Sequence, residues 1–197
     1  MKSPARQRRF RNLSIVAGAT LLAATLGFVG YQHANRLPKR FAPVVEGQLY
    51  RSGEVHPAHL EALREEYGIT RVISLLNPDV PLSQAERDAC ETLGIRYENI
   101  EMRGNGDSTP EARARLMQLL DEADQGPTLV HCAAGTNRTG LAIGLYRIRE
   151  QGWTYEQVLE EMKQFSFDDL DKHEGMRAAL RAAASENLHN ESLTELP

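Results

Sequence analysis

A cysteine and an arginine six residues apart lie within the segment His131–Gly140, HCAAGTNRTG. An arginine offers a planar set of N–H donors that binds two oxygens of one phosphate group. A glycine-containing turn between a strand and a helix directs backbone N–H groups inward, and the start of the helix adds a positive dipole. In such a field the pKa of Cys132 is expected to fall, which favours the nucleophilic thiolate. The spacing therefore predicts a nucleophilic cysteine held against a bound phosphate.

The neighbouring residues fit the same chemistry. Gly135 permits the tight turn, and Thr139 carries a hydroxyl that can hydrogen-bond the thiolate. We expect His131 to support the loop through a backbone hydrogen bond rather than to act as an acid or base. A buried structural cysteine is the simpler alternative. That alternative would not require Gly, Arg and Thr at three, six and seven residues after Cys132.

This segment resembles the H-C-x5-R-[ST] signature of the cysteine-dependent protein tyrosine phosphatases. The resemblance includes LYRSGEV near Tyr50, ITRVISLL and GPTLVHCAAGTNRTGLAIGLYRIREQGW, and it covers about residues 44–180. These stretches are similar to the compact dual-specificity-like branch in bacteria, which includes the periplasmic TpbA-type phosphatases. The resemblance implies that Cys132 is the nucleophile and that Arg138 binds the phosphate. It implies that the backbone of the residues between them completes the phosphate site: Ala133, Ala134, Gly135, Thr136 and Asn137.

A general acid must protonate the oxygen that leaves the phosphorus. The resemblance implies an aspartate on a loop before the strand of the nucleophile, and Asp107 is the only aspartate in EMRGNGDSTP. Asp107 precedes Cys132 by 25 residues, a slightly shorter gap than is typical of close relatives. An ungapped match would fall on Asn105, which cannot donate as an acid. Glu101 is a weaker substitute, and Asp107 also suits a position before a helix.

Three functions remain open. The first is a protein phosphatase that hydrolyses phosphotyrosine, and also phosphoserine or phosphothreonine, through a phosphocysteine intermediate. The resemblance favours it, since relatives that act on inositol phosphates often carry lysine in the loop where this chain has neutral side chains. The second is a phosphatase of a phospholipid or a small phosphorylated metabolite such as an inositol phosphate. The third is a membrane-tethered pseudophosphatase that binds phosphoproteins. We expect no metal and no other cofactor, and the sequence leaves the oligomeric state open.

The elements that position these residues alternate along the chain. Strands are predicted at residues 47–55, 69–76, 95–102 and 128–132, and helices at 57–68, 83–94, 108–126, 138–152, 154–165 and 174–187. Ser108 and Glu111 can form a capping box at the start of the third helix. This order predicts an α/β fold with a central, mostly parallel sheet flanked by helices, as in the compact dual-specificity phosphatases. Ligands in such folds bind beyond the carboxyl ends of the strands. Arg51 and Ser52 are expected at the rim of the pocket.

The N-terminal segment differs from the rest in composition. Residues 1–41 carry eight Lys or Arg and no acid, whereas the remainder carries 15 Lys or Arg against 27 Asp or Glu, which argues against nucleic acid as a partner. Residues 12–32 are apolar and as a helix would span roughly 30 Å. We therefore predict an N-terminal transmembrane helix in the inner membrane, with the catalytic domain on the periplasmic side. A cleaved signal peptide is the alternative, whereas a buried core helix fits badly because there is no polar face.

The predicted organisation has five parts: a basic cytoplasmic tail (1–11), a transmembrane anchor or signal segment (12–32), a linker (33–43), a phosphatase domain (44–188) and a C-terminal tail (189–197). Two cysteines are too few for a disulfide scaffold. Cys90 is expected in the core of a helix, and whether it pairs with Cys132 stays open. The expected partners are a phosphorylated protein substrate and, through the N-terminal helix, the membrane.

Overall fold

The computed structural model describes Thr25, residues 36–122 and residues 126–194, with side chains as far as His189. The chain divides at Arg36 into two compact units, Met1–Arg36 and Leu37–Pro197. The second unit is an α/β domain, and it contains every candidate site residue identified from the sequence.

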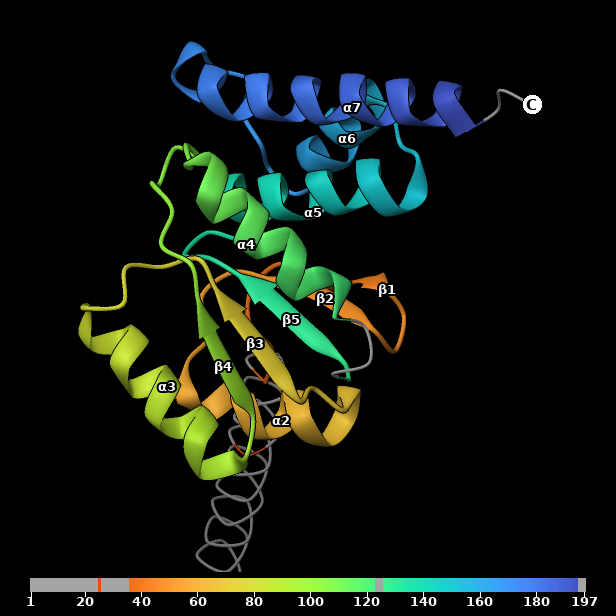
Figure 1. The fold of residues 1–197 in the computed structure, drawn as a ribbon. Coiled ribbons are helices and arrows are strands. Elements are labelled where there is room, and N and C mark those ends of the chain that lie inside the picture. The colour runs from red at the N-terminus through yellow and green to blue at the C-terminus, as the bar shows by residue number, and fades with distance from the viewer. Residues whose placement is uncertain (1–24, 26–35, 123–125, 195–197) are drawn as a thin grey trace, which may run out of the picture. The chain divides into compact units, whose positions relative to one another are not determined.

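Within the described residues, five strands form one sheet in the order β1-β2-β5-β3-β4 (Figure 1). The strands are β1 (Ala42–Val45), β2 (Leu49–Ser52), β3 (Arg71–Ser74), β4 (Arg96–Asn99) and β5 (Thr128–His131). β1 is antiparallel to β2, and the other neighbours are parallel, so the predicted mostly parallel sheet is confirmed. Ser52 and Ser74 lie level with His131. The carboxyl ends of three parallel strands therefore meet where Cys132 follows β5.

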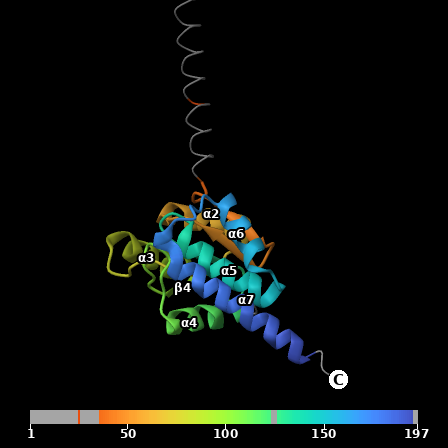
Figure 2. The same cartoon turned by 90° about the horizontal axis from the view of Figure 1, so that it is seen from above.

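Helices cover both faces of the sheet, as the alternation of elements predicts. They are α2 (Pro57–Tyr67), α3 (Pro81–Leu93), α4 (Pro110–Asp121), α5 (Asn137–Gln151), α6 (Tyr155–Gln164) and α7 (Glu174–Thr194), with a short 3-10 turn η2 (Asp171–His173) before α7. α2 and α3 lie on one face, and the other four helices lie on the opposite face, where α7 runs alongside α5 (Figure 2). Val72 and Leu129 pack in the first layer, whereas Ile73 and Val130 pack in the second. This alternation buries both faces of the central strands.

The ends of the helices follow local sequence signals, but the starts of α3 and α4 differ from the predicted ones. α2 begins with proline and ends before Gly68, and α3 ends before Gly94, as expected. α3 begins at Pro81, two residues before the predicted start at Ser83, because proline suits the first turn of a helix. At α4 the N-cap is Thr109, whose hydroxyl accepts a hydrogen bond from the Ala112 amide at 3.2 Å. The expected cap was Ser108. Pro110 is the first helical residue and holds the preceding residue in an extended conformation, which makes that residue the cap.

The predicted transmembrane helix is not supported and has to be corrected. A span needs about 20 consecutive apolar residues in one helix. No described helix is long and apolar enough to cross a membrane; α7, at 21 residues, carries charges such as Arg177 and Arg181. Apart from Thr25, the range 12–32 lies outside the described residues. The predicted membrane contact therefore has no support, and the location on the periplasmic side stays a prediction.

Candidate active site

Cys132 lies in the loop that joins β5 to α5. The residue is 2% exposed, and its Sγ accepts a hydrogen bond from the Gly135 amide at 3.2 Å. Gly135 has a φ of 75°, and a Cβ at this position would lie 2.6 Å from the backbone nitrogen of Gly53. The left-handed conformation and the close approach of β2 both require glycine here. The loop therefore curls tightly around the sulfur, as the spacing predicts.

The surroundings of Cys132 favour its thiolate. Burial raises the pKa of the thiol, but the hydroxyl and amide of Thr139, the charge of Arg138 and the Gly135 amide outweigh burial, so the pKa is lowered from its ordinary value. The Thr139 hydroxyl also lies 3.4 Å from the Ser52 carbonyl, so its single hydrogen serves one of the two acceptors at a time. Cys90 differs: it is a free, fully buried thiol whose pKa is raised to about 12, chiefly by burial.

Arg138 and Asn137 connect this loop to the segment that carries Asp107. Arg138 Nη1 donates to the Leu75 carbonyl at 3.0 Å and to the Met102 carbonyl at 3.5 Å. Asn137 Nδ2 donates to the Gly104 carbonyl at 3.3 Å. The cation and the loop before α4 are thus held together at the carboxyl end of the sheet, where the sequence predicts a phosphate site.

The Asp107 carboxylate is directed toward the start of α7. Asp107 Oδ2 accepts a hydrogen bond from Asn105 Nδ2 at 2.8 Å, and the buried Oδ1 has no hydrogen-bond partner among the described residues. A Cβ at Gly175 would lie 2.2 Å from Oδ1, so the carboxylate packs directly on the first turn of α7. Asp107 and Glu101 both line an open hollow of about 560 Å³. The structure brings the predicted acid to the same end of the sheet as Cys132 without a direct contact between them.

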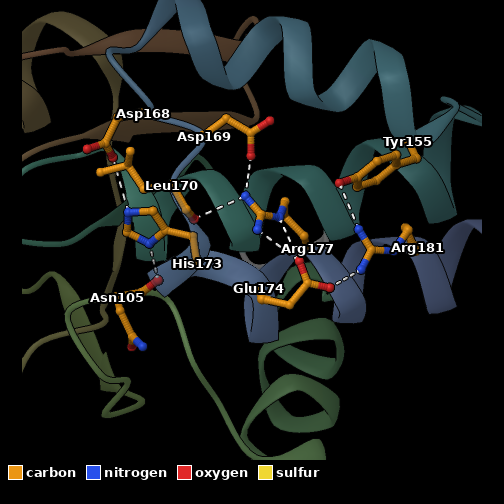
Figure 3. A network of polar contacts seen from close by, with 9 residues as sticks. All are labelled: Asn105, Tyr155, Asp168, Asp169, Leu170, His173, Glu174, Arg177 and Arg181. Atoms are coloured by element: carbon orange, nitrogen blue, oxygen red, sulfur yellow. Dashed lines mark hydrogen bonds and ion pairs between the residues drawn. The ribbon is translucent and has the colours of Figure 1, made fainter.

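His173 ties the loop of Asp107 to η2 and α7 (Figure 3). The ring is 1% exposed; Nδ1 lies 2.8 Å from the Asn105 carbonyl oxygen, and Nε2 lies 3.1 Å from Asp168 Oδ1. In the same network Arg177 binds Asp169 and Glu174. The acidic stretch after α6 is therefore part of a polar network that positions the loop.

These features can be compared with known proteins. The sequence pattern of the Tyrosine phosphatase family matches residues 37–188. The chain belongs to this family. The dual specificity protein phosphatase TpbA of Pseudomonas aeruginosa (strain UCBPP-PA14) is 31% identical to it over 140 residues, which are 71% of this chain and 61% of TpbA. The match thus spans about three fifths of that relative's length.

Solved structures of family relatives share the fold. A crystal structure of P. aeruginosa TpbA matches with a TM-score of 0.58 at 26% identity, covering 80% of this chain and 98% of that chain. TpbA has also been solved in complex with pTyr. The inositol diphosphatase SIW14 of Saccharomyces cerevisiae is 28% identical over 135 residues, which are 66% of this chain and 46% of SIW14. The core catalytic domain of SIW14, a PP-IP phosphatase, matches with a TM-score of 0.66 at 22% identity, covering 80% and 93% of the two chains. At that identity the structural likeness shows the fold alone.

His131 supports the loop of this phosphatase-family member in a way that the sequence does not suggest. Its ring is fully buried, and Nε2 lies 2.7 Å from Oε1 of Glu86 on α3, which is also fully buried. The two atoms are close enough for an ion pair but lack the angles of a hydrogen bond. The expected backbone hydrogen bond from the ring is absent from the described interactions. The contact with Glu86 stands in its place.

Three further cations near the loop come from the segment before β1 and from β2. Arg51, expected at the rim, is 1% exposed and donates from Nη2 to the Gly135 carbonyl at 3.0 Å. Arg40 donates from Nη1 to the Ala134 carbonyl at 2.9 Å. The side chain of Lys39 covers Gly53, where a Cβ would lie 2.6 Å from Lys39 Cγ. Lys39 and Arg40 fall in the predicted linker, which gave no signal for a role at the site.

Proposed function

We propose that this protein hydrolyses phosphate monoesters through a phosphocysteine formed on Cys132. The observation that carries the proposal is the environment of the Cys132 thiol, whose pKa is lowered, despite burial, by Thr139, Arg138 and the Gly135 amide. A loop that stabilises a negative sulfur also attracts the phosphate oxygens that approach it. Membership of the Tyrosine phosphatase family supports the same activity.

The reaction has two steps. In the first, the thiolate of Cys132 attacks phosphorus, an S–P bond forms, and the P–O bond to the leaving group breaks. Asp107 gives its proton to the departing oxygen, so that the leaving group departs as a neutral alcohol or phenol. In the second, water attacks the phosphocysteine and gives a proton to the Asp107 carboxylate. The S–P bond breaks, and phosphate and the Cys132 thiolate are released.

Arg138 and the loop amides stabilise the charge on the three oxygens that stay on phosphorus. The guanidinium is already held by the Leu75 carbonyl at 3.0 Å, which leaves its other N–H groups for the phosphate. Asp107 has to turn from Asn105 toward the sulfur before it can donate, and the glycines at 104 and 106 permit such a movement.

Phosphotyrosine in proteins is the first substrate that we propose, with phosphoserine and phosphothreonine as further substrates. Ala133, Ala134, Thr136 and Asn137 place no cation in the loop, which suits a singly phosphorylated side chain. TpbA, a dual specificity protein phosphatase that has been solved with pTyr, supports this choice.

A small polyphosphate such as an inositol phosphate is the second candidate, and one observation favours it. Lys39 and Arg40 bring two cations to the outer edge of the loop, where a second phosphate group of the same substrate would find opposite charge. The similarity to SIW14, an inositol diphosphatase, points to the same class.

The test compares purified protein with its Cys132→Ser variant on a phosphotyrosine peptide and on an inositol polyphosphate. We expect phosphate release by the parent and none above background by Cys132→Ser, because serine at this position lacks a stable anionic form. A large preference for the inositol polyphosphate would reverse the order of the substrates. A folded parent that binds phosphopeptide without releasing phosphate would be a pseudophosphatase, and the proposed activity would be wrong.

A further inference from the structure

Arg51 is a buried cation behind the phosphate-binding loop. It lies on β2 level with Val130 of β5, two residues before Cys132, and it is 1% exposed. Its guanidinium stacks on the ring of Phe165, with Cζ 3.6 Å from the ring centroid. Nη2 donates to the Gly135 carbonyl, whereas Nε and Nη1 are buried without a hydrogen-bond partner among the described residues. Burying a charge with unpaired donors destabilises a fold, so a stability role alone explains this arginine poorly.

Three consecutive carbonyl groups of the phosphate-binding loop, at residues 133–135, accept hydrogen bonds from donors outside the loop, and Arg51 binds the third. The Glu54 amide donates to the Ala133 carbonyl at 3.1 Å, Arg40 donates to Ala134, and Arg51 donates to Gly135. The N–H and C=O of one peptide unit point in opposite directions. Carbonyls fixed outward therefore turn the amides of the following residues inward, toward an anion. The bond from the Gly135 amide to Cys132 Sγ fits this arrangement.

The charge of Arg51 also acts on the sulfur. Burial lowers the pKa of Arg51 to about 10, so the guanidinium keeps its charge at neutral pH. Glu161 and Cys132 oppose this lowering, while the cations Arg147 and Arg40 add to it. Because electrostatic coupling between two groups is reciprocal, a cation favoured by the Cys132 thiolate must in turn favour the thiolate. Arg51 bonds the loop through the Gly135 carbonyl, whereas Arg138 is held by the Leu75 and Met102 carbonyls through Nη1 and keeps its other N–H groups for a phosphate.

We propose that Arg51 is a positioning residue of the phosphate-binding loop: it holds the Gly135 carbonyl outward and supplies a second positive charge that stabilises the Cys132 thiolate. This inference rests on the proposed function, since it assigns how the same site is kept ready for its substrate. Arg51 does not touch the substrate and acts through the loop and the sulfur.

The test measures alkylation of Cys132 by iodoacetamide against pH in the full-length protein. The second cysteine, Cys90, is fully buried with a pKa of about 12 and stays silent over this range. We expect Arg51→Met to lower the alkylation rate at about pH 6 by roughly tenfold and to move the midpoint of the profile upward, because the thiolate loses a cation. Arg51→Lys should restore most of the rate, since it keeps the charge. Arg51→Gln keeps a donor for Gly135 without the charge and should give a rate between those of Arg51→Met and Arg51→Lys.

Arg71→Met is the matched control. Arg71 is also a buried arginine, 2% exposed, but it lies at the opposite end of the sheet, where it donates to Thr128 Oγ1 at 3.0 Å and pairs with Glu122. Its loss should lower the melting temperature and leave the alkylation profile unchanged. If Arg51→Met does not fold, the comparison of Arg51→Gln with Arg51→Lys decides, because both retain a donor and only lysine retains the charge.

The outcomes separate this inference from the proposed function. A parent whose Cys132 is unreactive near neutral pH contradicts the proposed function itself. A reactive parent with the same pH profile in folded Arg51→Met or Arg51→Gln overturns only the role of Arg51. A shift of equal size in Arg71→Met would show a general effect of losing a buried arginine, and it would also overturn the proposal.

Discussion

Asp107 is the residue whose removal should depend most on the leaving group. We expect Asp107→Asn to lower kcat on a phosphotyrosine peptide by about a hundredfold, because the tyrosyl oxygen is a poor leaving group without a proton. The loss should be small for an aryl phosphate with a strongly acidic phenol, which leaves as a stable anion. Steady-state rates on a series of aryl phosphates would measure this dependence.

Glu101→Gln is the control for Asp107, since Glu101 is exposed, lines the same hollow and was the weaker alternative from the sequence. It should leave the dependence on the leaving group unchanged. Equal losses in the two variants, or a larger loss in Glu101→Gln, would contradict the assignment of Asp107.

At the scale of single residues, the sequence predicts the site residues that lie within one loop. It does not predict the side chains that reach this loop from distant parts of the chain. Cys132, Gly135 and Arg138 are separated by six residues or fewer, so a strand, a turn and a helix start are enough to place them. Glu86 lies 45 residues before its partner His131, and Arg51 lies 81 residues before Cys132. Their contacts depend on the order of strands in the sheet, which local spacing does not encode.

The loop before α4 and the start of α7 form one unit through His173. The ring faces two acceptors, the Asn105 carbonyl and Asp168, and it satisfies both only when both ring nitrogens carry hydrogen. We expect His173→Leu, which keeps bulk but loses both contacts, to lower kcat on phosphotyrosine by about tenfold, because the loop that carries Asp107 is no longer fixed. As for Asp107→Asn, the loss should be greatest with poor leaving groups.

Arg177→Met provides the comparison for His173→Leu, because Arg177 belongs to the same network and its hydrogen bonds to described residues go to Asp169, Leu170 and Glu174 and not to the loop of Asp107 (Figure 3). It should lower the melting temperature without any dependence of the rate loss on the leaving group. If both variants lose activity in the same pattern, the network supports α7 in general and His173 has no special link to Asp107.

The elements themselves follow from local signals, whereas their contacts do not. Proline and glycine mark the two ends of α2, glycine marks the end of α3, and hydrophobic runs mark the buried strands, so these features were predicted correctly, whereas α3 begins at Pro81 and not at Ser83. The acidic residues at 168–171 are exposed, as charged residues most often are, and their sequence carries no signal for a contact. In the fold, Asp168 meets His173 and Asp169 meets Arg177, since the turn η2 brings the stretch back onto α7.

At the scale of the whole molecule, the alternation of strands and helices was enough to predict a parallel sheet covered on both faces. The reason is general: parallel strands need crossover connections, and helices supply them on both sides. The apolar run at residues 12–32 was interpreted by length and charge alone, and the described helices give no support for a span. The sequence likewise predicts that the domain starts at residue 44. The compact unit begins at Leu37, so it includes residues that the composition assigns to a linker.

Two truncations test where the phosphatase unit starts. Removal of residues 1–36 should leave kcat/KM and the melting temperature unchanged, because the compact unit and the family match both begin at Leu37. Removal of residues 1–41 should lower the melting temperature by about 5 °C or more, since Phe41 stacks on Tyr50 at 5.5 Å and meets Tyr67 edge-on at 4.5 Å between ring centroids. It should also lower kcat/KM, because Arg40 no longer holds the Ala134 carbonyl.

Phe41→Ala in the full chain separates the two effects. This variant should destabilise the fold, whereas Arg40 keeps its contact with the Ala134 carbonyl and kcat/KM stays unchanged. Loss of activity on removing residues 1–36 alone would mean that the working unit extends beyond the domain and that its boundary at Leu37 is wrong.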